Sequence, residues 1–260
     1  MSRTPLFLVA CTLLAPIHAY AADTVAPPST FIGAGLWTRP AYVGSDNSVL
    51  ALIPLVRYYG NPWFVRTTQG VLEGGARAEV MRGFNLGVQL AYEGGRVSKE
   101  SDFLKNHKVE SLSAGASWGV HAEYDTKIGP SPINLLARYR QEVKSDRGTQ
   151  VDLRITAGIY GGELLKAGVF AQTTWANAKS NQTYYGITAP QSATTGLAVY
   201  NAASGVVSSA AGLLWSYDLN AKWMLQGSFE GRLLQADLSN SPLVQTRNSR
   251  YASVGLAYQF

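Results

Sequence analysis

Apolar and polar residues alternate along many short stretches of this chain. The clearest stretch is Phe84–Gly94, where Phe84, Leu86, Val88, Leu90 and Tyr92 alternate with Asn85, Gly87, Gln89 and Glu93. Side chains of a β-strand point alternately to its two faces, so each such stretch has one apolar and one polar face. A strand between lipid and a polar lumen needs this pattern.

The same reading divides the chain into strands separated by turns and loops. We predict strands over Thr30–Arg39, Val49–Tyr59, Pro62–Thr67, Gly70–Val80, Phe84–Gly94, Val109–Tyr124, Ser131–Glu142, Gln150–Tyr160, Lys166–Ala176, Ser204–Tyr217, Lys222–Gln235 and Arg250–Phe260. The long connections are Pro40–Ser48, Gly95–Lys108, Val143–Thr149, Asn177–Ala203 and Ala236–Ser249. Tight turns alternate with these loops, as in bacterial outer-membrane barrels, whose termini and short turns face the periplasm. The fold class is therefore all-β: a transmembrane antiparallel up-and-down β-barrel of about twelve strands, or ten if the early hairpin Pro62–Val80 does not span the membrane.

The last strand also carries a terminal signature. Ala252, Val254, Leu256, Tyr258 and Phe260 share one face, and Tyr251, Ser253, Gly255, Ala257 and Gln259 share the other. Ser253, Gly255, Tyr258 and Phe260 resemble the C-terminal assembly signal of bacterial outer-membrane barrels. We therefore expect the barrel-assembly machinery and outer-membrane lipid as partners, and the bacterial outer membrane as the location.

The first residues have the features of an export signal. A basic head at Arg3 precedes the apolar run Leu6–Ile17 and the small-residue site Ala19-Tyr20-Ala21. We predict a cleaved signal peptide over residues 1–21 and a barrel over residues 22–260. Leu8–Cys11 also matches a lipoprotein box, but the apolar run continues past Cys11, which favours ordinary cleavage.

Cleavage changes what chemistry the chain can perform. Cys11 is the only cysteine, so the mature chain would have no thiol and no disulfide. Arg3 leaves as well, so the mature chain has 21 basic and 17 acidic residues. A net charge of +4 is small and does not indicate nucleic-acid binding. No apolar run of about 18 residues follows the signal, so we expect no transmembrane helix.

Few residues could form an active site, so we expect no enzyme. The mature chain has two histidines: His107 in a predicted loop, expected to be solvated, and His121 on an inward face beside Glu123. We expect His121 to be a hydrogen-bonded lumen residue. No His, Asp and Glu cluster has metal-ligand spacing, and no glycine-rich stretch lies between a strand and a helix. We expect neither cofactor nor metal.

Charged residues on the inward faces are the more informative group. They are Arg138, Arg140, Glu142, Asp152, Arg154, Glu230 and Arg232, with Glu73, Arg77 and Glu79 in the early hairpin. Opposite charges across neighbouring strands stabilise pairing by about 0.2–1 kcal/mol each. These charges either brace the wall as a polar network or line a narrow water-filled path for small solutes.

Several segments resemble one protein family. Tyr184, Tyr185 and Gly186, then Gln191 and Ser192, then Gly196 and Tyr200 resemble the loop signature of the MipA/OmpV family of MltA-interacting outer-membrane proteins. Arg39–Asp46, Gly94–Arg96 with Ser101-Asp102, Ser241–Val244 and Arg250–Phe260 resemble other parts of that family. The resemblance covers nearly the whole mature chain, and Pro62–Val80 matches least.

The resemblance implies a non-enzymatic outer-membrane barrel. Members of the family are described as scaffolds that join a murein-degrading lytic transglycosylase to a murein-synthesising penicillin-binding protein, and others are linked to surface contacts. No residue-level motif for these roles can be carried over. A narrow channel for small solutes is the alternative function.

Overall fold

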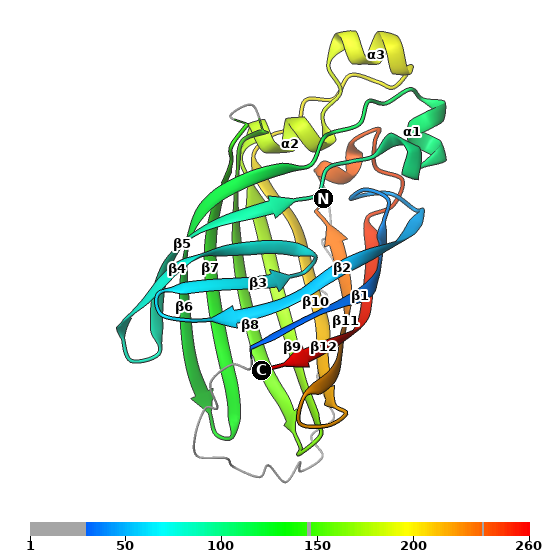
Figure 1. Cartoon of the computed structure of the whole chain (residues 1–260). Coiled ribbons are helices and arrows are strands. Elements are labelled where there is room, and N and C mark those ends of the chain that lie inside the picture. The colour runs from blue at the N-terminus through cyan, green and yellow to red at the C-terminus, as the bar shows by residue number, and fades with distance from the viewer. Residues whose placement is uncertain (1–29, 145–146, 236) are drawn as a thin grey trace, which may run out of the picture.

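The computed structural model describes residues 30–144, 147–235 and 237–260, which form a closed β-barrel (Figure 1). Its strands are β1 (Phe31–Pro40), β2 (Ser48–Tyr59), β3 (Trp63–Thr68), β4 (Val71–Met81), β5 (Phe84–Glu93), β6 (Gly115–Ile128), β7 (Ser131–Glu142), β8 (Thr149–Gly161), β9 (Leu165–Ala176), β10 (Gly205–Asp218), β11 (Trp223–Leu234) and β12 (Asn248–Gln259). Each strand pairs antiparallel with its neighbours in the chain, and β1 pairs with β12 to close the barrel. The prediction of a twelve-stranded up-and-down barrel is confirmed.

Two predicted boundaries are wrong by more than two residues. The strand predicted from Val109 begins only at Gly115, because Val109–Ala114 runs back along the preceding loop, where Arg96 and Leu112 form an isolated bridge. That strand also continues to Ile128, through part of the predicted turn.

The long connections contain helices that the alternation could not reveal. They are η1 (Ser98–Glu100) and α1 (Asp102–Asn106), α2 (Ala178–Tyr185) and α3 (Ala189–Thr195), and η3 (Leu238–Asn240). None of these described helices is long and apolar enough to cross a bilayer. The long connections gather at one end of the barrel and the tight turns at the other (Figure 1). By the barrel rule, the short-turn end, which carries Phe260, faces the periplasm.

The seam between β2 and β3 is the shortest in the wall. β2 and β3 share three residue pairs, from Arg57↔Arg66 to Tyr59↔Phe64, whereas β1 and β2 share ten. The predicted early hairpin is therefore real, but β3 is short. The β3–β4 turn at Gln69-Gly70 points toward the outer end of the barrel, but it is tight, whereas the other connections at that end are long.

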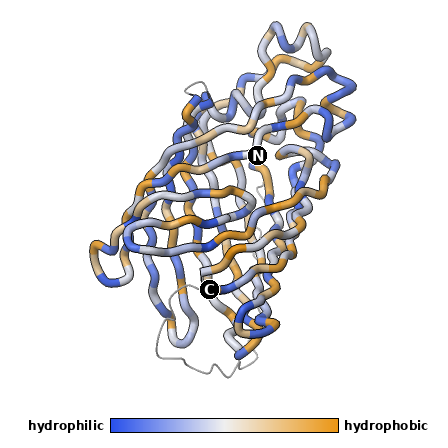
Figure 2. Tube along the Cα trace, viewed as in Figure 1, coloured by the Kyte–Doolittle hydropathy of each residue, from blue (hydrophilic) through white to orange (hydrophobic). Residues whose placement is uncertain are grey.

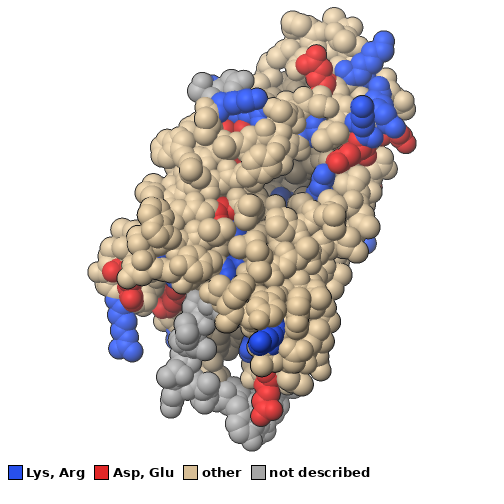
Figure 3. Space-filling model, viewed as in Figure 1, with Lys and Arg blue, Asp and Glu red and all other residues tan. Residues whose placement is uncertain are grey.

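The outer face of the barrel is apolar. Leu52 is 82% exposed and Leu90 is 64% exposed, as outward positions of β2 and β5. The hydropathy trace follows this alternation along the strands (Figure 2). On the visible face, charged side chains gather toward the two ends, and the band between them is almost free of charge (Figure 3). An exposed apolar band with charge at its edges is what a surface in contact with lipid requires.

Aromatic residues lie near the edges of this band. Trp118, Trp175 and Trp223 are exposed, whereas Trp215 is half-buried. Tyr258 packs edge-to-face against Trp223, with ring centroids 5.3 Å apart, and against Phe260, 5.2 Å apart. The two aromatic residues of the C-terminal signature thus lie together on the outer face at the periplasmic end.

The other two signature residues face inward. Ser253 lies 2.8 Å from the Ser228 hydroxyl, and Gly255 lies against β1 and β2. A Cβ at Gly255 would come within 2.4 Å of Leu55 Cδ1 and 2.6 Å of the Ala34 carbonyl oxygen.

This close contact predicts that Gly255→Ala lowers the free energy of unfolding by about 1–3 kcal/mol, as overpacking does. Urea unfolding of the purified barrel in detergent measures it. Gly231→Ala in β11 is the matched control, because a Cβ there meets nothing within 4 Å. Equal urea midpoints for the two variants would show that Leu55 and β1 can move aside.

The predicted signal peptide, its cleavage site, Cys11 and the lead to Ser29 lie outside the described residues. They remain predictions from the sequence.

Candidate functional site

A network of buried ion pairs crosses the lumen. At its centre, Glu73 on β4 is 1% exposed and accepts hydrogen bonds from Arg66 Nε at 2.5 Å and Arg138 Nη1 at 2.7 Å. Arg66 also pairs with Glu123 on β6, and Arg138 donates to Asp152 Oδ2 at 2.9 Å. These ion pairs connect the inward faces of five strands: β3, β4, β6, β7 and β8.

Two of these pairs follow directly from strand register. Arg66 lies opposite Glu73, and Arg138 lies opposite Asp152. The contact between Arg138 and Glu73 is different, because β4 and β7 are not neighbours in the sheet and the two side chains must meet inside the barrel. Charged groups taken out of water this way are tolerated when they are paired and hydrogen-bonded.

Arg140 extends the network toward the outer mouth. Its Nη1 lies 2.7 Å from Glu93 Oε1, and its Nη2 lies 2.9 Å from Asp152 Oδ2. Asp152 also accepts from the Thr174 hydroxyl at 2.8 Å. Thr174 belongs to β9, and the structure places Thr174, Gln172 and Phe170 on the inward face of that strand.

The opposite wall carries a smaller polar group. Arg232 donates to Glu230 Oε1 at 2.7 Å, and its guanidinium lies 4.6 Å from the Tyr251 ring centroid. Glu230 also accepts from Gln69 Nε2 at 2.8 Å. Gln69 is at the tip of the short β3–β4 hairpin, so this contact ties that tip to β11 on another part of the wall. Sequence reasoning missed Gln69 and Arg66.

The remaining predicted lumen charges are spread over both ends. Arg77 contacts Glu123 at 3.4 Å, whereas Glu79 is exposed and accepts from the Gly83 backbone N–H. Arg154 makes no ion pair within the described residues and stacks on Phe170, 3.9 Å from the ring centroid. Glu142 belongs to the outer mouth.

Neither histidine behaves as expected. His121 is buried, and neither of its ring nitrogens has a hydrogen-bond partner among the described residues. Its ring instead packs edge-on against Phe64, with centroids 5.2 Å apart. His107 is half-buried rather than simply solvated, since its Nδ1 lies 3.1 Å from the Thr195 carbonyl oxygen. No serine or carboxylate lies in hydrogen-bond contact with the His121 ring in the described chain.

Four outer connections pack into one layer over the outer mouth, which we call the cap. Its first apolar cluster contains Ala41, Tyr42, Leu104, Val109, Ile187 and Leu243, and its second contains Tyr185, Ala202, Leu234 and Leu238. These residues come from the connections β1–β2, β5–β6, β9–β10 and β11–β12, with Leu234 at the end of β11. Buried apolar clusters of this kind indicate fixed loop positions.

Polar contacts hold the cap to itself and to the barrel. Tyr42 donates its hydroxyl to the Leu243 carbonyl at 2.9 Å, and Arg96 donates to the Tyr184 carbonyl at 3.0 Å. Tyr184 donates its hydroxyl to Glu142 at 2.6 Å, which ties the cap to the end of β7. Burial raises the pKa of Tyr42 and Tyr184, and the nearby Glu142 charge adds to the rise for Tyr184. Both phenols therefore stay protonated and able to donate.

The predicted signature residues build the fold of the β9–β10 connection. Gln191 completes the capping box of α3 with Thr188, and Gly196 ends that helix at φ 70°, a left-handed value that favours glycine. Tyr200 pairs through its backbone with Ile187, and Tyr185 is buried in the cap. Gly186 and Ser192 lie at the end of α2 and within α3. The capping box with a proline in the first turn was the sequence signal for α3.

Below the network and the β3–β4 tip lies a cavity of about 1570 Å³, which we call the vestibule. Its walls run from Gln69, Glu230 and Tyr251 down to Pro130, Gly162 and Gln259 near the short turns. No residue of the cap lines it among those the structure describes. The barrel thus has a capped outer mouth, a lumen crossed by ion pairs, and a hollow periplasmic half.

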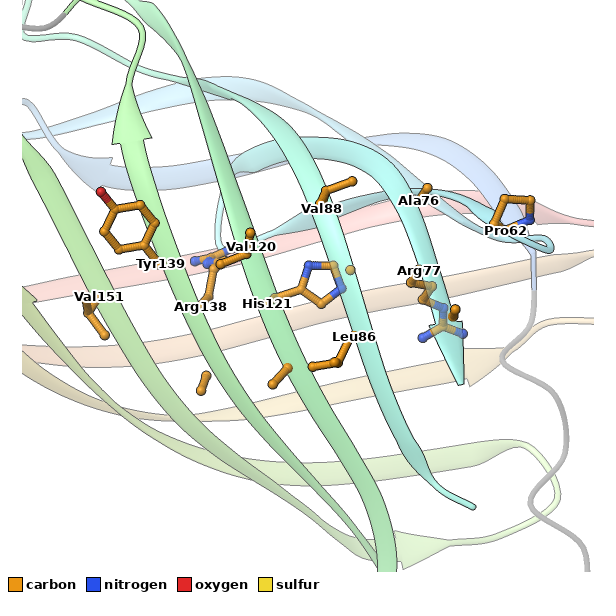
Figure 4. A pocket seen from close by; sticks show the side chains of 14 residues that line it. Pro62, Ala76, Arg77, Leu86, Val88, Val120, His121, Arg138, Tyr139 and Val151 are labelled. Carbon is orange, nitrogen blue, oxygen red and sulfur yellow. The ribbon is translucent and has the colours of Figure 1, made fainter. Parts of the chain in front are cut away.

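A separate apolar groove of about 660 Å³ crosses the wall on β4–β8 (Figure 4). Strand register aligns Ala78, Leu86, Ala122 and Ala137 in one row, and Ala76, Val88, Val120 and Tyr139 in the next. The small alanine side chains make the outer surface concave between larger neighbours. Its apolar character suits lipid chains.

Comparisons with known proteins identify a family and several barrels of low similarity. A family described as MltA-interacting protein MipA matches residues 32–260. No curated protein matches the chain. LpxR from Salmonella typhimurium is 8% identical with a TM-score of 0.49, covering 88% of this chain and 100% of that chain. An outer membrane channel from Pseudomonas putida F1 is 10% identical with a TM-score of 0.44, covering 93% and 99%. OmpT of Vibrio cholerae is 7% identical with a TM-score of 0.39, covering 93% and 100%.

At these identities and scores, no activity transfers from the solved structures. The family match spans nearly all the described residues, and the closed barrel has an apolar outer band. The chain belongs to the MltA-interacting protein (MipA) family and is an outer-membrane β-barrel.

Proposed function

We propose that this barrel is a non-enzymatic scaffold that joins a lytic transglycosylase to a penicillin-binding protein at the periplasmic face of the outer membrane. The observation that carries the proposal is the family match over residues 32–260. The capped mouth and the ion pairs across the lumen are consistent with a protein that binds partners on its surface and does not conduct solutes.

The geometry limits where such partners could bind. Enzymes of murein metabolism act in the periplasm, so the contact surface must be the short-turn end. Leu164 and Leu219 lie exposed in the β8–β9 and β10–β11 turns, beside the charged rim residues Lys166 and Asp218. Exposed apolar side chains among rim charges are typical of contact surfaces between proteins.

Site-specific photo-crosslinking in cells tests the scaffold. A crosslinking residue at Leu219 should capture a lytic transglycosylase and a penicillin-binding protein, identified by mass spectrometry. The same residue at Val199, which is exposed in the cap, should capture neither. Absence of both enzymes from the products at Leu219 and at Leu164 would refute the scaffold.

The second candidate is a narrow channel for small solutes, which the hollow periplasmic half favours. Planar-bilayer recordings distinguish the two. We expect no stable conductance steps from the purified barrel, because ion pairs cross the lumen and the cap covers its outer mouth. Stable steps under conditions in which a known porin also conducts would favour the channel.

The proposal also includes export and processing. We propose that residues 1–21 are removed and that residues 22–260 form the mature barrel. Intact-mass measurement tests this, and an acylated N-terminus at Cys11 would contradict it.

A further inference from the structure

The vestibule carries more positive than negative charge. Eight basic residues line it: Arg57, Arg66, Arg77, Arg82, Lys127, Arg154, Lys166 and Arg232. Four acidic residues line it: Glu123, Asp125, Asp218 and Glu230. An enclosed surface with this excess of four positive charges attracts anions, because low-dielectric walls focus the field.

Three of the arginines lack an acidic partner within the described parts of the chain: Arg82, exposed in the β4–β5 turn, and Arg57 and Arg154 on the walls. The Arg57 side chain takes part in no ion pair or hydrogen bond there, although it is exposed and lines the vestibule. Arg154 donates Nε to the Thr156 hydroxyl at 3.2 Å, and its buried Nη1 has no partner. By contrast, Arg66 and Arg232 are paired with glutamates. Arg66 also has one buried donor without a partner, Nη2, but its charge is balanced by Glu73 and Glu123, which Arg57 and Arg154 lack.

Both guanidinium groups are held in place by aromatic rings. Arg57 Cζ lies 5.0 Å from the Phe31 ring centroid, and Arg154 Cζ lies 3.9 Å from that of Phe170. A guanidinium over a ring keeps donors along its edge free for a carboxylate or phosphate oxygen. Stacking also limits the side chain's freedom, so less entropy is lost when an anion binds.

The two arginines approach the vestibule from opposite walls. β2 and β8 are six places apart in the ring of twelve strands. An anion in the vestibule between these walls would supply acceptors to the unpaired guanidinium groups.

An apolar wall lies directly beside Arg57. Phe31, Ile53, Leu55, Met224 and Ala257 form one cluster, with Trp37 packed against it. Phe31 is the cross-strand partner of Arg57, so cation and apolar surface adjoin. Inward-facing apolar residues are unusual in a barrel lumen, which is normally polar. A ligand that uses both features must combine an anionic group with an apolar body.

We propose that the vestibule binds, from the periplasm, a small amphiphilic anion. Its carboxylate or phosphate group contacts Arg57 and Arg154, and its apolar body contacts the wall around Phe31 and Leu55. The volume of about 1570 Å³ exceeds the roughly 300–1,000 Å³ typical of small-molecule pockets, so such a ligand fits with water. This inference does not depend on the scaffold.

Calorimetric titration of the full barrel in nanodiscs of zwitterionic lipid tests the site. The probes are hexyl phosphate, hexanoate, inorganic phosphate and hexanol. We expect the two amphiphilic anions to bind at least tenfold more tightly than inorganic phosphate or hexanol. We also expect affinity to fall as salt rises, because salt screens the arginine charges.

Arg57→Gln and Arg154→Gln should each weaken binding of the amphiphilic anions at least tenfold. Arg57→Lys and Arg154→Lys should retain part of it, because they keep the charge and lose the planar fork. Arg250→Gln is the matched control and should leave binding unchanged, since Arg250 does not line the vestibule. Urea midpoints of all variants show which of them remain folded.

Three results would overturn the proposal. One is no binding of hexyl phosphate or hexanoate at millimolar concentration. Another is binding that survives both glutamine substitutions in folded protein. The third is inorganic phosphate binding as tightly as hexyl phosphate. That result would show an anion site to which the apolar wall contributes nothing.

Discussion

Glu73→Gln is expected to lower the free energy of unfolding by about 3–5 kcal/mol, the usual cost of removing one partner from a buried ion pair. Glu73 accepts from Arg66, Arg138 and Gln89 and is 1% exposed, so water cannot replace its charge. Arg66 would keep Glu123, and Arg138 would keep Asp152, which is why the loss should not be larger. Urea unfolding in detergent, followed by tryptophan fluorescence, measures the change.

Glu79→Gln is the control, because it makes the same chemical change on the same strand. Glu79 is exposed, and the amide oxygen can still accept from Gly83 N–H. Its effect should stay within about 0.5 kcal/mol, as for most surface substitutions. A Glu73→Gln midpoint equal to that of Glu79→Gln would mean that the lumen network contributes nothing to stability.

Leu104→Ala is expected to open the cap without unfolding the barrel. Leu104 is fully buried in the first apolar cluster of the cap, and such truncations cost about 2–5 kcal/mol. The cap is joined to the wall mainly at strand ends, so this loss should appear as local opening. Trypsin added to intact cells should then cut at Lys105 or Lys108, both exposed beside Leu104, at least 30-fold faster than in the unaltered protein.

Leu164→Ala is the matched control, since Leu164 is 51% exposed in a periplasmic turn. It should change neither the cleavage rate nor the urea midpoint. Cleavage of Leu104→Ala at the rate of the unaltered protein would contradict a cap held by its apolar core. If both cleavage and barrel unfolding shifted together, the cap and the barrel would be one cooperative unit.

Alternation predicted the strands best where one face meets lipid. β7 begins and ends at the predicted residues, and the inward positions predicted for β5, β6 and β11 are inward in the structure. It failed at β9, because small and polar residues such as Gln172 and Thr173 occupy successive positions. It also failed at Val109–Ala114, where the alternating residues belong to a loop that forms part of the cap.

The candidate site was only partly within reach of the sequence. Arg138 and Asp152 were expected in the lumen on neighbouring strands. The sequence did not predict that Glu73 accepts hydrogen bonds from both Arg66 and Arg138, or that Gln69 contacts Glu230. Such contacts depend on how strongly the strands tilt and how the barrel closes, which no single strand encodes.

The sequence by itself determined the class of fold and the face of most strands that meets lipid, because these depend on a period of two within each segment. It left twelve and ten strands open, and the tertiary structure decided for twelve because β3 and β4 are both paired into the wall. Only the tertiary structure decided which charges meet across the lumen, that the outer mouth is capped, and that Arg57 and Arg154 remain without acidic partners in the described chain. Those outcomes arise from register and closure, which bring together residues far apart in the chain.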